Sequence, residues 1–374
     1  MKYDILIVGA GPAGAYTAYR LAQADLDVLL LEKEELPRYK PCGGGLTSKV
    51  FGIIPEFNLD HVIEDKISTV VFTHNVEAPI KLDFIEPFTY MTMRDKFDYF
   101  LVQQAKEVGV KVIDNTPVVD IRCMSDRVRV CTTGSEYTAK YIIGADGARS
   151  LVAQQLGLMD GVESAIAYEK EIKVSSQLLE AQRGIMNLDY GIIHGGYSWI
   201  FPKVDHFSVG VGTFAEGVSL KKSLEDYLAK GKIDDYKELK AKGHPLPVGG
   251  SKRELTYKRA VLIGDAAGLV DPLSGEGIFY ALKSADLASR ILLDVIRRGK
   301  SLSRYTTLIN QEILPEFRKA ELIKKIFFKF SDLLHKLFMK ENWILKKLIQ
   351  VIYGDDTYSN LYDNIQNQIP LLKF

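Results

Sequence analysis

The opening stretch, MKYDILIVGAGPAGAYTAYRLAQADLDVLLLE (residues 1–32), decides the fold. A short apolar run at 5–8 leads directly into the glycine-rich turn GAGPAG at 9–14, and helical spacing follows over 15–24. A second apolar run then ends at Glu32. This order of strand, turn, helix, strand and acid predicts a βαβ unit that binds a dinucleotide, with a purely structural βαβ turn as the alternative.

Each residue of the turn has a physical role in such a site. Gly9 permits the tight turn, Gly11 lets a pyrophosphate approach the backbone, and Gly14 lets the helix pack closely on the strand. The free N–H groups and the positive end of the helix favour a phosphate at this point. Glu32 lies where a ribose hydroxyl would be held, although the acid does not identify the dinucleotide.

Composition indicates an ordinary soluble enzyme rather than a nucleic-acid binder. The 374 residues can bury a sizeable core and predict two or three domains. Lys plus Arg balances Asp plus Glu at 48 each, so no charge excess points to nucleic acid. Cys42, Cys123 and Cys131 are too few and too scattered for a disulfide framework or a zinc site. We therefore expect no metal and a cytosolic location.

The sequence predicts no membrane span and no targeting segment. No apolar run approaches the ~18 residues needed to cross a bilayer. The chain enters its first strand within three residues, which leaves no room for a signal peptide. Any membrane contact is expected to be peripheral, and we expect a monomer.

The segment KEELPRYKPCGGGLTSKV (33–50) is predicted to contact a ligand. Its prolines and its three consecutive glycines at 43–45 cannot belong to a helix or a regular strand, so the backbone must pass close to another group. A flexible surface loop is the alternative. Flexible linkers, however, seldom carry Arg38, Lys40 and Cys42 among prolines and glycines.

Two positions in the following segments are further candidates for ligand contact. Arg94 opens a helix that should run to about residue 108, where the helix dipole disfavours a cation. Arg94 therefore either answers a nearby anion or is a solvated surface residue. Patterns at 111–113 and 117–143 predict a strand and an antiparallel meander. The backbone at Val118 could meet an adenine edge or simply pair in the sheet.

The nucleotide domain is predicted to be discontinuous. A second glycine turn, GADG at 144–147, and a third, GDAAG at 264–268, each follow a strand pattern. Between them, alternating segments over 161–250 predict an inserted, mostly antiparallel sheet on the substrate side, joined by strands at 67–72 and 80–90. The expected units are a nucleotide domain (1–66, 91–160 and 251–310), a sheet domain (67–90 and 161–250) and a C-terminal helical region (311–374).

Residues 316–353 are predicted to be helical and amphipathic. They carry nine Lys or Arg against four Asp or Glu. Amphipathic helices normally dock on their own protein, and the alternative here is a helix that lies on an anionic membrane surface. The apolar positions that keep helical spacing are Leu322, Ile326, Phe330, Leu333, Leu337, Ile344, Leu348 and Ile352.

Taken together, the GxGPAG turn, the acid, the Cys-Gly-Gly loop, the Arg-led helix, GADG and the late GDAAG resemble FAD-dependent enzymes of the para-hydroxybenzoate hydroxylase fold. The resemblance runs from residue 1 to about residue 300. It implies an α/β fold: a glutathione-reductase-type, Rossmann-like FAD domain with an inserted sheet and a C-terminal helical segment. KPCGGGL at 40–46 and YSWIFP at 197–202 further resemble the geranylgeranyl reductase family. That family hydrogenates prenyl chains of archaeal glycerophospholipids or chlorophyll precursors.

The resemblance implies non-covalent FAD. The implied contacts are Gly9, Gly11, Ala13 and Gly14 at the pyrophosphate, Glu32 at the ribose, Arg94 toward the phosphates or ribityl chain, Asp265 at the ribityl end, Gly277 and Ile278 near the pyrimidine ring, and Cys42, Gly43 and Gly45 along the isoalloxazine. Physical reasoning supports two of these roles. Asp265 follows a strand and precedes small residues, so its carboxylate can reach a hydroxyl. The helix that begins after Gly277 can face the flavin where negative charge develops on reduction.

Reduction of an isolated prenyl double bond needs a hydride on one carbon and a proton on the other. Because no carbonyl polarises the alkene, cation-like character must be tolerated in a dry, aromatic cavity. Tyr197, Trp199 and Phe201 share one strand face and could form that wall, with ordinary sheet packing as the alternative. Cys42 is the candidate residue for reactivity beside the flavin, in proton delivery.

The main rival hypothesis is an FAD-dependent aromatic hydroxylase or halogenase-type monooxygenase on the same fold. Halogenases carry an aromatic-x-Trp-x-aliphatic-Pro segment, from which Tyr197 and Phe201 depart, and the KPCGGG loop favours the reductase. The large substrate domain argues against a flavin-binding sensor. The electron donor is expected to be NAD(P)H or reduced ferredoxin, and Ala153, where hydroxylases often carry an Arg, favours a ferredoxin-like partner. The expected substrate is a prenylated lipid.

Overall fold

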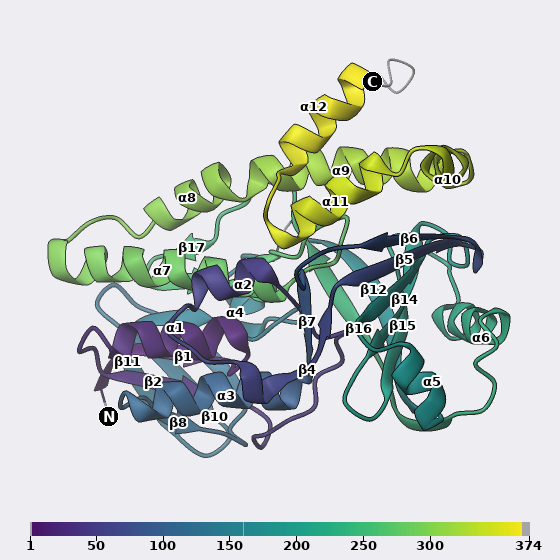
Figure 1. The fold of residues 1–374 in the computed structure, drawn as a ribbon. Helices are drawn as coiled ribbons and strands as arrows, with labels where there is room; N and C mark the ends of the chain where they lie inside the picture. The colour runs from purple at the N-terminus through teal and green to yellow at the C-terminus, as the bar shows by residue number, and fades with distance from the viewer. Residues whose placement is uncertain (1, 160, 369–374) are drawn as a thin grey trace.

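The N-terminal βαβ unit builds the first of three sheets in the computed structural model, which describes residues 2–159 and 161–368 (Figure 1). Its parallel strands lie in the order β18 (Ala260–Leu262), β11 (Glu136–Gly144), β1 (Lys2–Val8), β2 (Val28–Leu31) and β8 (Lys111–Ile113). The antiparallel strands at its margins are β17 (Thr256–Tyr257), β10 (Val128–Thr132) and β9 (Val118–Cys123). The late strand β18 closes this sheet, so the predicted discontinuous Rossmann-like domain is confirmed.

Helices cover this parallel sheet, which explains why β2 and the second half of β1 are continuous apolar runs rather than alternating ones. All four residues of β2 are buried. The main covering helix is α1 (Pro12–Ala22), which has Pro12 in its first turn, where a missing N–H costs nothing. It packs against α7 (Ile278–Arg298) and α3 (Arg94–Glu107). The short α4 (Leu151–Gln155) follows the second glycine turn.

Close packing at the first turn requires two of its glycines. Gly9 has a φ of +101°, and a Cβ there would lie 2.4 Å from the carbonyl oxygen of Ala145. A Cβ on Gly14 would lie 1.9 Å from the carbonyl oxygen of Gly9. No side chain fits at either distance, so these two positions accept only glycine.

The second sheet joins two segments that lie far apart in the sequence. Its strands lie in the order β16 (Lys237–Val248), β12 (Glu163–Lys173), β15 (Phe207–Thr213), β14 (Gly196–Pro202), β13 (Ile185–Asp189), β5 (Thr69–His74) and β6 (Glu77–Asp83). Every neighbouring pair is antiparallel except β13 with β5. This is the inserted, mostly antiparallel sheet that the sequence predicts. The helices inserted between its strands are α5 (Ser176–Ala181) and α6 (Leu220–Lys230).

A third, small sheet corrects two expectations. It consists of β3 (Gly45–Thr47), β7 (Thr89–Thr92) and β4 (Ile63–Ile67), and the short helices near it are α2 (Ser48–Ile53) and η1 (Asp60–Val62). The prediction of one strand over 80–90 is wrong, because the chain leaves β6 at Asp83, passes Pro87, which has no N–H to donate, and starts β7 in another sheet. The prediction that no glycine of 43–45 joins a strand is also wrong, since Gly45 pairs with Met91.

The C-terminal region is helical, and most of it docks on the second sheet (Figure 1). Its helices are α8 (Arg304–Glu312), α9 (Leu314–Lys329), α10 (Ser331–Lys340), α11 (Trp343–Tyr353) and α12 (Tyr358–Gln368). Residues of α9 to α12 share one buried cluster with Val70, Phe72, Ile80 and Leu82 of β5 and β6. Docking on the protein body, the first of the two alternatives, is therefore confirmed for these helices. The predicted region extends to residue 374, and 369–374 lie outside the described residues.

The single apolar stripe predicted across 316–353 is wrong in detail. Leu322 and Leu333 are 42% and 65% exposed, whereas the next residues, Ile323 and Leu334, are buried. The reason is that three helices replace one, with breaks at Phe330 and at 341–342 that change the direction of the chain. Within the described residues, no helix is long and apolar enough to cross a membrane.

The packing of the C-terminal helices predicts a contrast between two leucines. Leu345 in α11 is fully buried in the shared cluster, so Leu345→Ala should lower the free energy of unfolding by roughly 2–5 kcal/mol. Leu333→Ala in α10 is the matched control and should change it by less than about 0.5 kcal/mol. Urea unfolding followed by circular dichroism measures both. Equal losses would contradict docking through α11.

Candidate active site

A cavity of about 700 Å³, here called the large pocket, lies where the three sheets and the C-terminal helices meet. It is lined by the first glycine turn, the segment 38–45, the start of α7, one face of the second sheet, and residues of α9 and α11. Every predicted site residue lines this pocket except Gly14, which is enclosed beside Gly9. Motifs spread over the sequence from Gly9 to Ile278 thus converge on one cavity.

The N-terminus of α1 forms one end of the large pocket. Gly11 is the N-cap of this helix, and no side chain caps the helix by a hydrogen bond. A Cβ on Gly11 would meet only the guanidinium of Arg38, at 3.8 Å. In contrast to Gly9 and Gly14, Gly11 therefore has open space beside it. Unpaired N–H groups and the helix dipole make this end suited to a phosphate.

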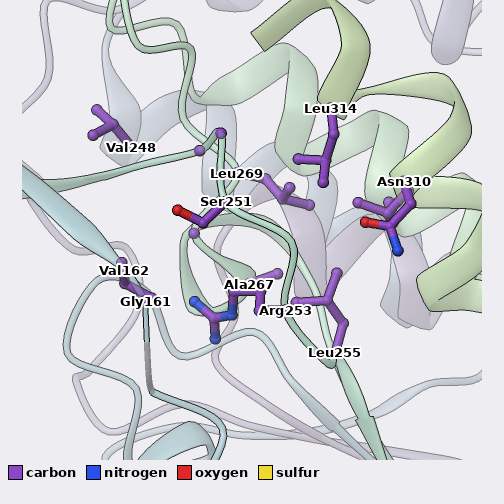
Figure 2. Close-up of a pocket in the computed structure, with 14 residues that line it drawn as sticks. Gly161, Val162, Val248, Ser251, Arg253, Leu255, Ala267, Leu269, Asn310 and Leu314 are labelled. Carbon is purple, nitrogen blue, oxygen red and sulfur yellow. The ribbon is translucent and has the colours of Figure 1, made fainter. Parts of the chain in front are cut away.

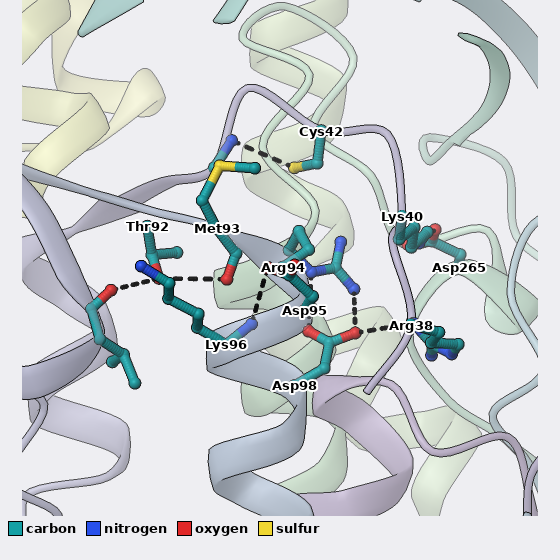
Figure 3. Close-up of polar contacts among 12 residues, drawn as sticks. Arg38, Lys40, Cys42, Thr92, Met93, Arg94, Asp95, Lys96, Asp98 and Asp265 are labelled. Atoms are coloured by element: carbon teal, nitrogen blue, oxygen red, sulfur yellow. Dashed lines mark hydrogen bonds and ion pairs between the residues drawn. The ribbon is translucent and has the colours of Figure 1, made fainter. Parts of the chain in front are cut away.

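A chain of buried charges lies beside that helix end, and Figure 3 shows its part from Arg38 through Asp98 to Arg94. The Glu32 carboxylate accepts a hydrogen bond from Ala10 N at 2.9 Å and lies 3.2 Å from Arg38 Nε. Arg38 also contacts Asp98 at 3.2 Å. Arg94 donates two hydrogen bonds to Asp98, at 2.7 and 2.8 Å. These contacts hold the side chains around the pocket in fixed positions.

Arg94 is 5% exposed, so the alternative of a solvated surface residue is wrong. Within the protein, Arg94 pairs with the anion Asp98, which lies one turn further along the same helix. Burial alone would lower the pKa of Arg94, but the charge of Asp98 outweighs burial and raises it. Arg94 therefore stays cationic at the pocket wall.

Asp265 forms the next polar group along the pocket. It lies in the 3₁₀ turn η2 (Gly264–Ala267), directly after β18, and Lys40 Nζ lies 3.3 Å from its carboxylate. Burial would raise the pKa of Asp265, but Lys40, His244 and Arg94 outweigh burial and lower it. Asp265 is therefore an anion. Gly277, the N-cap of α7, approaches it so closely that a Cβ there would lie 3.4 Å from Asp265 Oδ1.

The segment around Cys42 is held by buried groups from two sheets. Cys42 N donates to the carboxylate of Glu169 on β12 at 2.7 Å. Lys203 Nζ donates to the carbonyl oxygens of Gly43 at 2.7 Å and Thr92 at 2.9 Å. Cys42 Sγ accepts a hydrogen bond from Gly44 N at 3.4 Å (Figure 3). These contacts count against the alternative of a flexible surface loop, and ligand contact by this segment stays a prediction.

Three aromatic rings form a wall of the pocket. Tyr197, Trp199 and Phe201 alternate along β14, and their ring centroids follow one another at 6.1 Å. All three line the large pocket, so they share one face as predicted. Trp199 needs a glycine opposite it, because a Cβ on Gly210 would lie 2.2 Å from its ring.

Beyond this wall the pocket becomes apolar. Its lining there is contributed by β5, β13, the loop before α7, α9 and α11. The residues are Phe72, Met186, Leu188, Tyr190, Leu273, Phe327, Phe328, Leu348 and Ile352. One cavity thus joins a charged end, built from helix N-termini, to an end suited to a hydrocarbon.

Comparison with known proteins gives the family. Residues 2–192 match the family model described as FAD binding domain. The chain is 31% identical to geranylgeranyl diphosphate reductase of Rhodobacter capsulatus, over 80% of this chain and 77% of that protein. It is 30% identical to digeranylgeranylglycerophospholipid reductase of Methanocella arvoryzae, over 88% of each. The chain belongs to the FAD-dependent geranylgeranyl reductase family. This reductase is a flavoprotein that acts on carbon–carbon double bonds.

Solved structures share the fold more widely than the family. A geranylgeranyl bacteriochlorophyll reductase-like protein from Thermoplasma acidophilum matches with a TM-score of 0.84 at 22% identity, over 99% of this chain and 97% of that one. A flavin-dependent brominase matches with a TM-score of 0.77 at 18% identity, over 98% and 99%. At these identities the likeness concerns the fold alone.

The structure adds pocket residues that sequence reasoning did not select. Tyr39, Glu169 and His244 line the large pocket of the reductase, and Lys203 supports it. One signal was present in the sequence, since Glu169 and Glu171 occupy alternate positions of the strand segment YEKEIK and must share a face. An acidic face normally indicates solvent, but both residues here are buried.

A second hollow lies apart from this cavity, between Gly161, Ser251 and Leu314 (Figure 2). Its volume is about 10 Å³, the lower limit for a single water. We therefore place no ligand there.

The contrast between Gly11 and Gly14 yields a prediction about FAD. Gly11→Ala should raise the Kd for FAD at least about tenfold, or about 1.4 kcal/mol, because the methyl group enters the space left for a pyrophosphate. The stability of its apoprotein should match the wild type. Gly14→Ala is the control with the opposite expectation. Its methyl group would clash with Gly9 and should lower the free energy of unfolding by about 1–3 kcal/mol. Flavin fluorescence titration and urea unfolding measure both. Wild-type FAD affinity in Gly11→Ala would exclude the phosphate role.

Proposed function

We propose that this reductase hydrogenates isolated double bonds of geranylgeranyl chains, carried by an archaeal-type glycerophospholipid or a related isoprenoid. The observation that carries the proposal is the continuity of the large pocket from its charged end to its apolar end. A prenyl chain is a hydrocarbon with no polar group along its length, so it matches a cavity walled by Phe327, Phe328 and Leu348. The names of the relatives in Rhodobacter and Methanocella support the same substrate class.

FAD would lie extended along the charged end. The proposed contacts are Val118 at the adenine, Glu32 at the ribose, Gly9, Gly11 and Ala13 at the pyrophosphate with Gly14 supporting the turn, Arg94 and Asp265 toward the ribityl chain, Gly277 and Ile278 at the pyrimidine ring, and Cys42, Gly43 and Gly45 along the isoalloxazine. The residues present fit this cofactor because two helix N-termini without side-chain caps, those of α1 and α7, open into the same cavity. When bound and reduced, FAD supplies the hydride.

The chain itself must exclude water and tolerate positive charge on the alkene. Tyr197 and Trp199 form the aromatic wall beside the Cys42 segment, and their ring faces attract a cation. Trp199 is almost fully buried, so this part of the wall is dry. The Cys42 thiol, held by the contact from Gly44 N, is proposed to take part in proton delivery.

The alternative is an FAD-dependent aromatic hydroxylase or halogenase-type monooxygenase. Its support is the brominase fold match at 18% identity, which is weaker than the 30% identity with the Methanocella reductase. The two hypotheses differ in product, because a monooxygenase inserts oxygen whereas a reductase adds hydrogen.

Product mass distinguishes them. Anaerobically reduced protein given geranylgeranylated glycerophospholipid should yield lipids heavier by pairs of hydrogens, measured by mass spectrometry. We propose NAD(P)H or a reduced ferredoxin-like protein as the donor, identified by which of them bleaches the flavin without air. Protein without added reductant is the control. A product that gains one oxygen, and only in air, would overturn the reductase proposal in favour of the monooxygenase.

A cysteine pair tests the role of Cys42. Cys42→Ala should retain FAD, since the backbone N–H of this position still reaches Glu169, but should reduce alkene turnover by roughly 10²-fold or more. Cys131→Ala in β10, away from the large pocket, is the matched control and should keep wild-type turnover. Wild-type turnover in Cys42→Ala would remove the thiol from the mechanism.

We also propose that α10 makes peripheral contact with a membrane when the lipid substrate is loaded. Leu333 and Met339 are exposed on this helix, and Lys336 and Lys340 are exposed beside them. Apolar side chains flanked by cations suit an anionic interface. The protein should therefore float with vesicles that contain anionic lipid more than with neutral ones, and Leu333→Asp should weaken this without loss of stability. Flotation that is independent of both changes would contradict the contact.

A further inference from the structure

A line of polar groups connects the large pocket to solvent along β12. Glu169 and Glu171 are alternate residues of this strand and only 3% and 2% exposed. Glu169 lines the pocket. The Tyr39 hydroxyl donates to Glu169 Oε1 at 2.9 Å and lies 3.5 Å from Glu171 Oε1. Two buried acids thus share one tyrosine.

The line continues outward through a histidine. Glu171 Oε2 lies 3.0 Å from His206 Nε2 as an ion pair, without the geometry of a hydrogen bond. The other ring nitrogen, Nδ1, lies 2.7 Å from Asp205 Oδ1. His206 is nearly buried, whereas the Asp205 side chain is 69% exposed. Each residue in the line between solvent and the pocket therefore carries a group that can both accept and release a proton.

We propose that Asp205, His206, Glu171, Tyr39 and Glu169 form a proton path that supplies the large pocket from solvent. The inference rests on the proposed function, because alkene reduction consumes one hydride and one proton per double bond. The π electron pair of the alkene forms the new C–H bond to the proton, and the hydride forms the other. The Cys42 thiol is proposed to deliver the proton within the pocket, and the path supplies the route by which that proton arrives from solvent.

One transfer along the path balances as follows. His206 takes a proton at Nδ1 from the exposed side and releases one at Nε2 to Glu171. Glu171 passes a proton to the oxygen of Tyr39, which at the same time gives its own to Glu169. Glu169 then releases a proton into the pocket and returns to its carboxylate. The 3.5 Å step between Glu171 and Tyr39 is the longest in the path.

The charges around the path suit transfer near neutral pH. Burial, followed by repulsion from Glu171, raises the pKa of Glu169 to about 7, against the lowering effect of the bonds from Tyr39 and Cys42 N. Burial would lower the pKa of His206, but its contacts with Glu171 and Asp205 outweigh burial and raise it. Other titratable groups that face the path are Cys42, Lys203, Lys173 near Asp205, and Lys240 of β16, whose Nζ lies 4.3 Å from the Tyr39 ring centroid.

Glu169 also anchors the Cys42 segment, so the test must separate anchoring from proton transfer. Glu169→Gln retains an oxygen that can accept from Tyr39 and Cys42 N but cannot titrate. Glu171→Gln and His206→Gln interrupt the path further out. Glu163→Gln, at the exposed end of the same strand, is the matched control.

The first measurement needs neither FAD nor substrate. Infrared titration of the apoprotein should show a carboxylic acid C=O band that disappears near pH 7. The band should be absent in Glu169→Gln, shifted to lower pH in Glu171→Gln, which lacks the repelling charge, and unchanged in Glu163→Gln. A band with the same midpoint in Glu171→Gln, or no band near neutral pH, would overturn the coupling on which the path depends.

The second measurement follows protons directly in the FAD-loaded protein. Photoreduction of the flavin takes up protons from solution, and an indicator dye should record uptake at least tenfold slower in His206→Gln and Glu171→Gln than in Glu163→Gln, at equal FAD content. Wild-type uptake in both variants would overturn the path. Because this assay contains no prenyl lipid, slowed uptake in a protein that fails to reduce alkenes would refute the proposed function and leave the path standing.

Discussion

The segment 38–45 is fixed between two sheets by buried polar contacts, and the rest of the site depends on that constraint. On the side of the parallel sheet, Arg38 joins Glu32 to Asp98 and Lys40 reaches Asp265. On the side of the second sheet, the Glu169 carboxylate and Lys203 hold the backbone of the Cys42 segment. Buried charges are costly unless they are paired.

The Lys203 ammonium shows how strongly this arrangement constrains the protein. It is fully buried, and burial lowers its pKa against the pull of Glu171, Cys42 and Glu169. It donates to two carbonyl oxygens from separate parts of the chain, those of Gly43 and Thr92. Lys203 follows β14 of the second sheet, whereas Thr92 lies in β7 of the third sheet, so a shift between these two sheets would leave the cation without a partner. The position of the Cys42 segment is therefore coupled to the packing of the second sheet on the third.

Local motifs were predictable from the sequence, and interactions between distant buried charges were not. The glycine turn and Glu32 follow from residue spacing within one βαβ unit, and Asp265 follows from its place just after a strand, so neighbouring residues set the geometry of each. Glu169 and Glu171 were missed because an acidic alternation in a strand has the same appearance whether it faces solvent or a second buried layer. The prediction of one apolar stripe through Leu322 and Leu333 was wrong because the breaks between the helices change which side chains face the core.

The fold of this protein does not by itself determine its reaction. The brominase shares the fold over nearly the whole chain at 18% identity, so the arrangement of sheets does not by itself determine the reaction. The differences must lie in the pocket lining. Here that lining combines an immobilised cysteine segment with an apolar end to which the second sheet and the C-terminal helices both contribute.

The parallel pairing of β5 with β13 has a consequence for synthesis on the ribosome. The hairpin of β5 and β6 emerges early, but its partner strand begins only at Ile185, and the helices that cover Val70 and Leu82 come later still. The first sheet is likewise open until β18 has been made. Both sheets therefore carry uncovered apolar edges during translation, when non-local pairing is slow and aggregation competes. The nascent chain would be a natural client of chaperones until its last helices leave the exit tunnel.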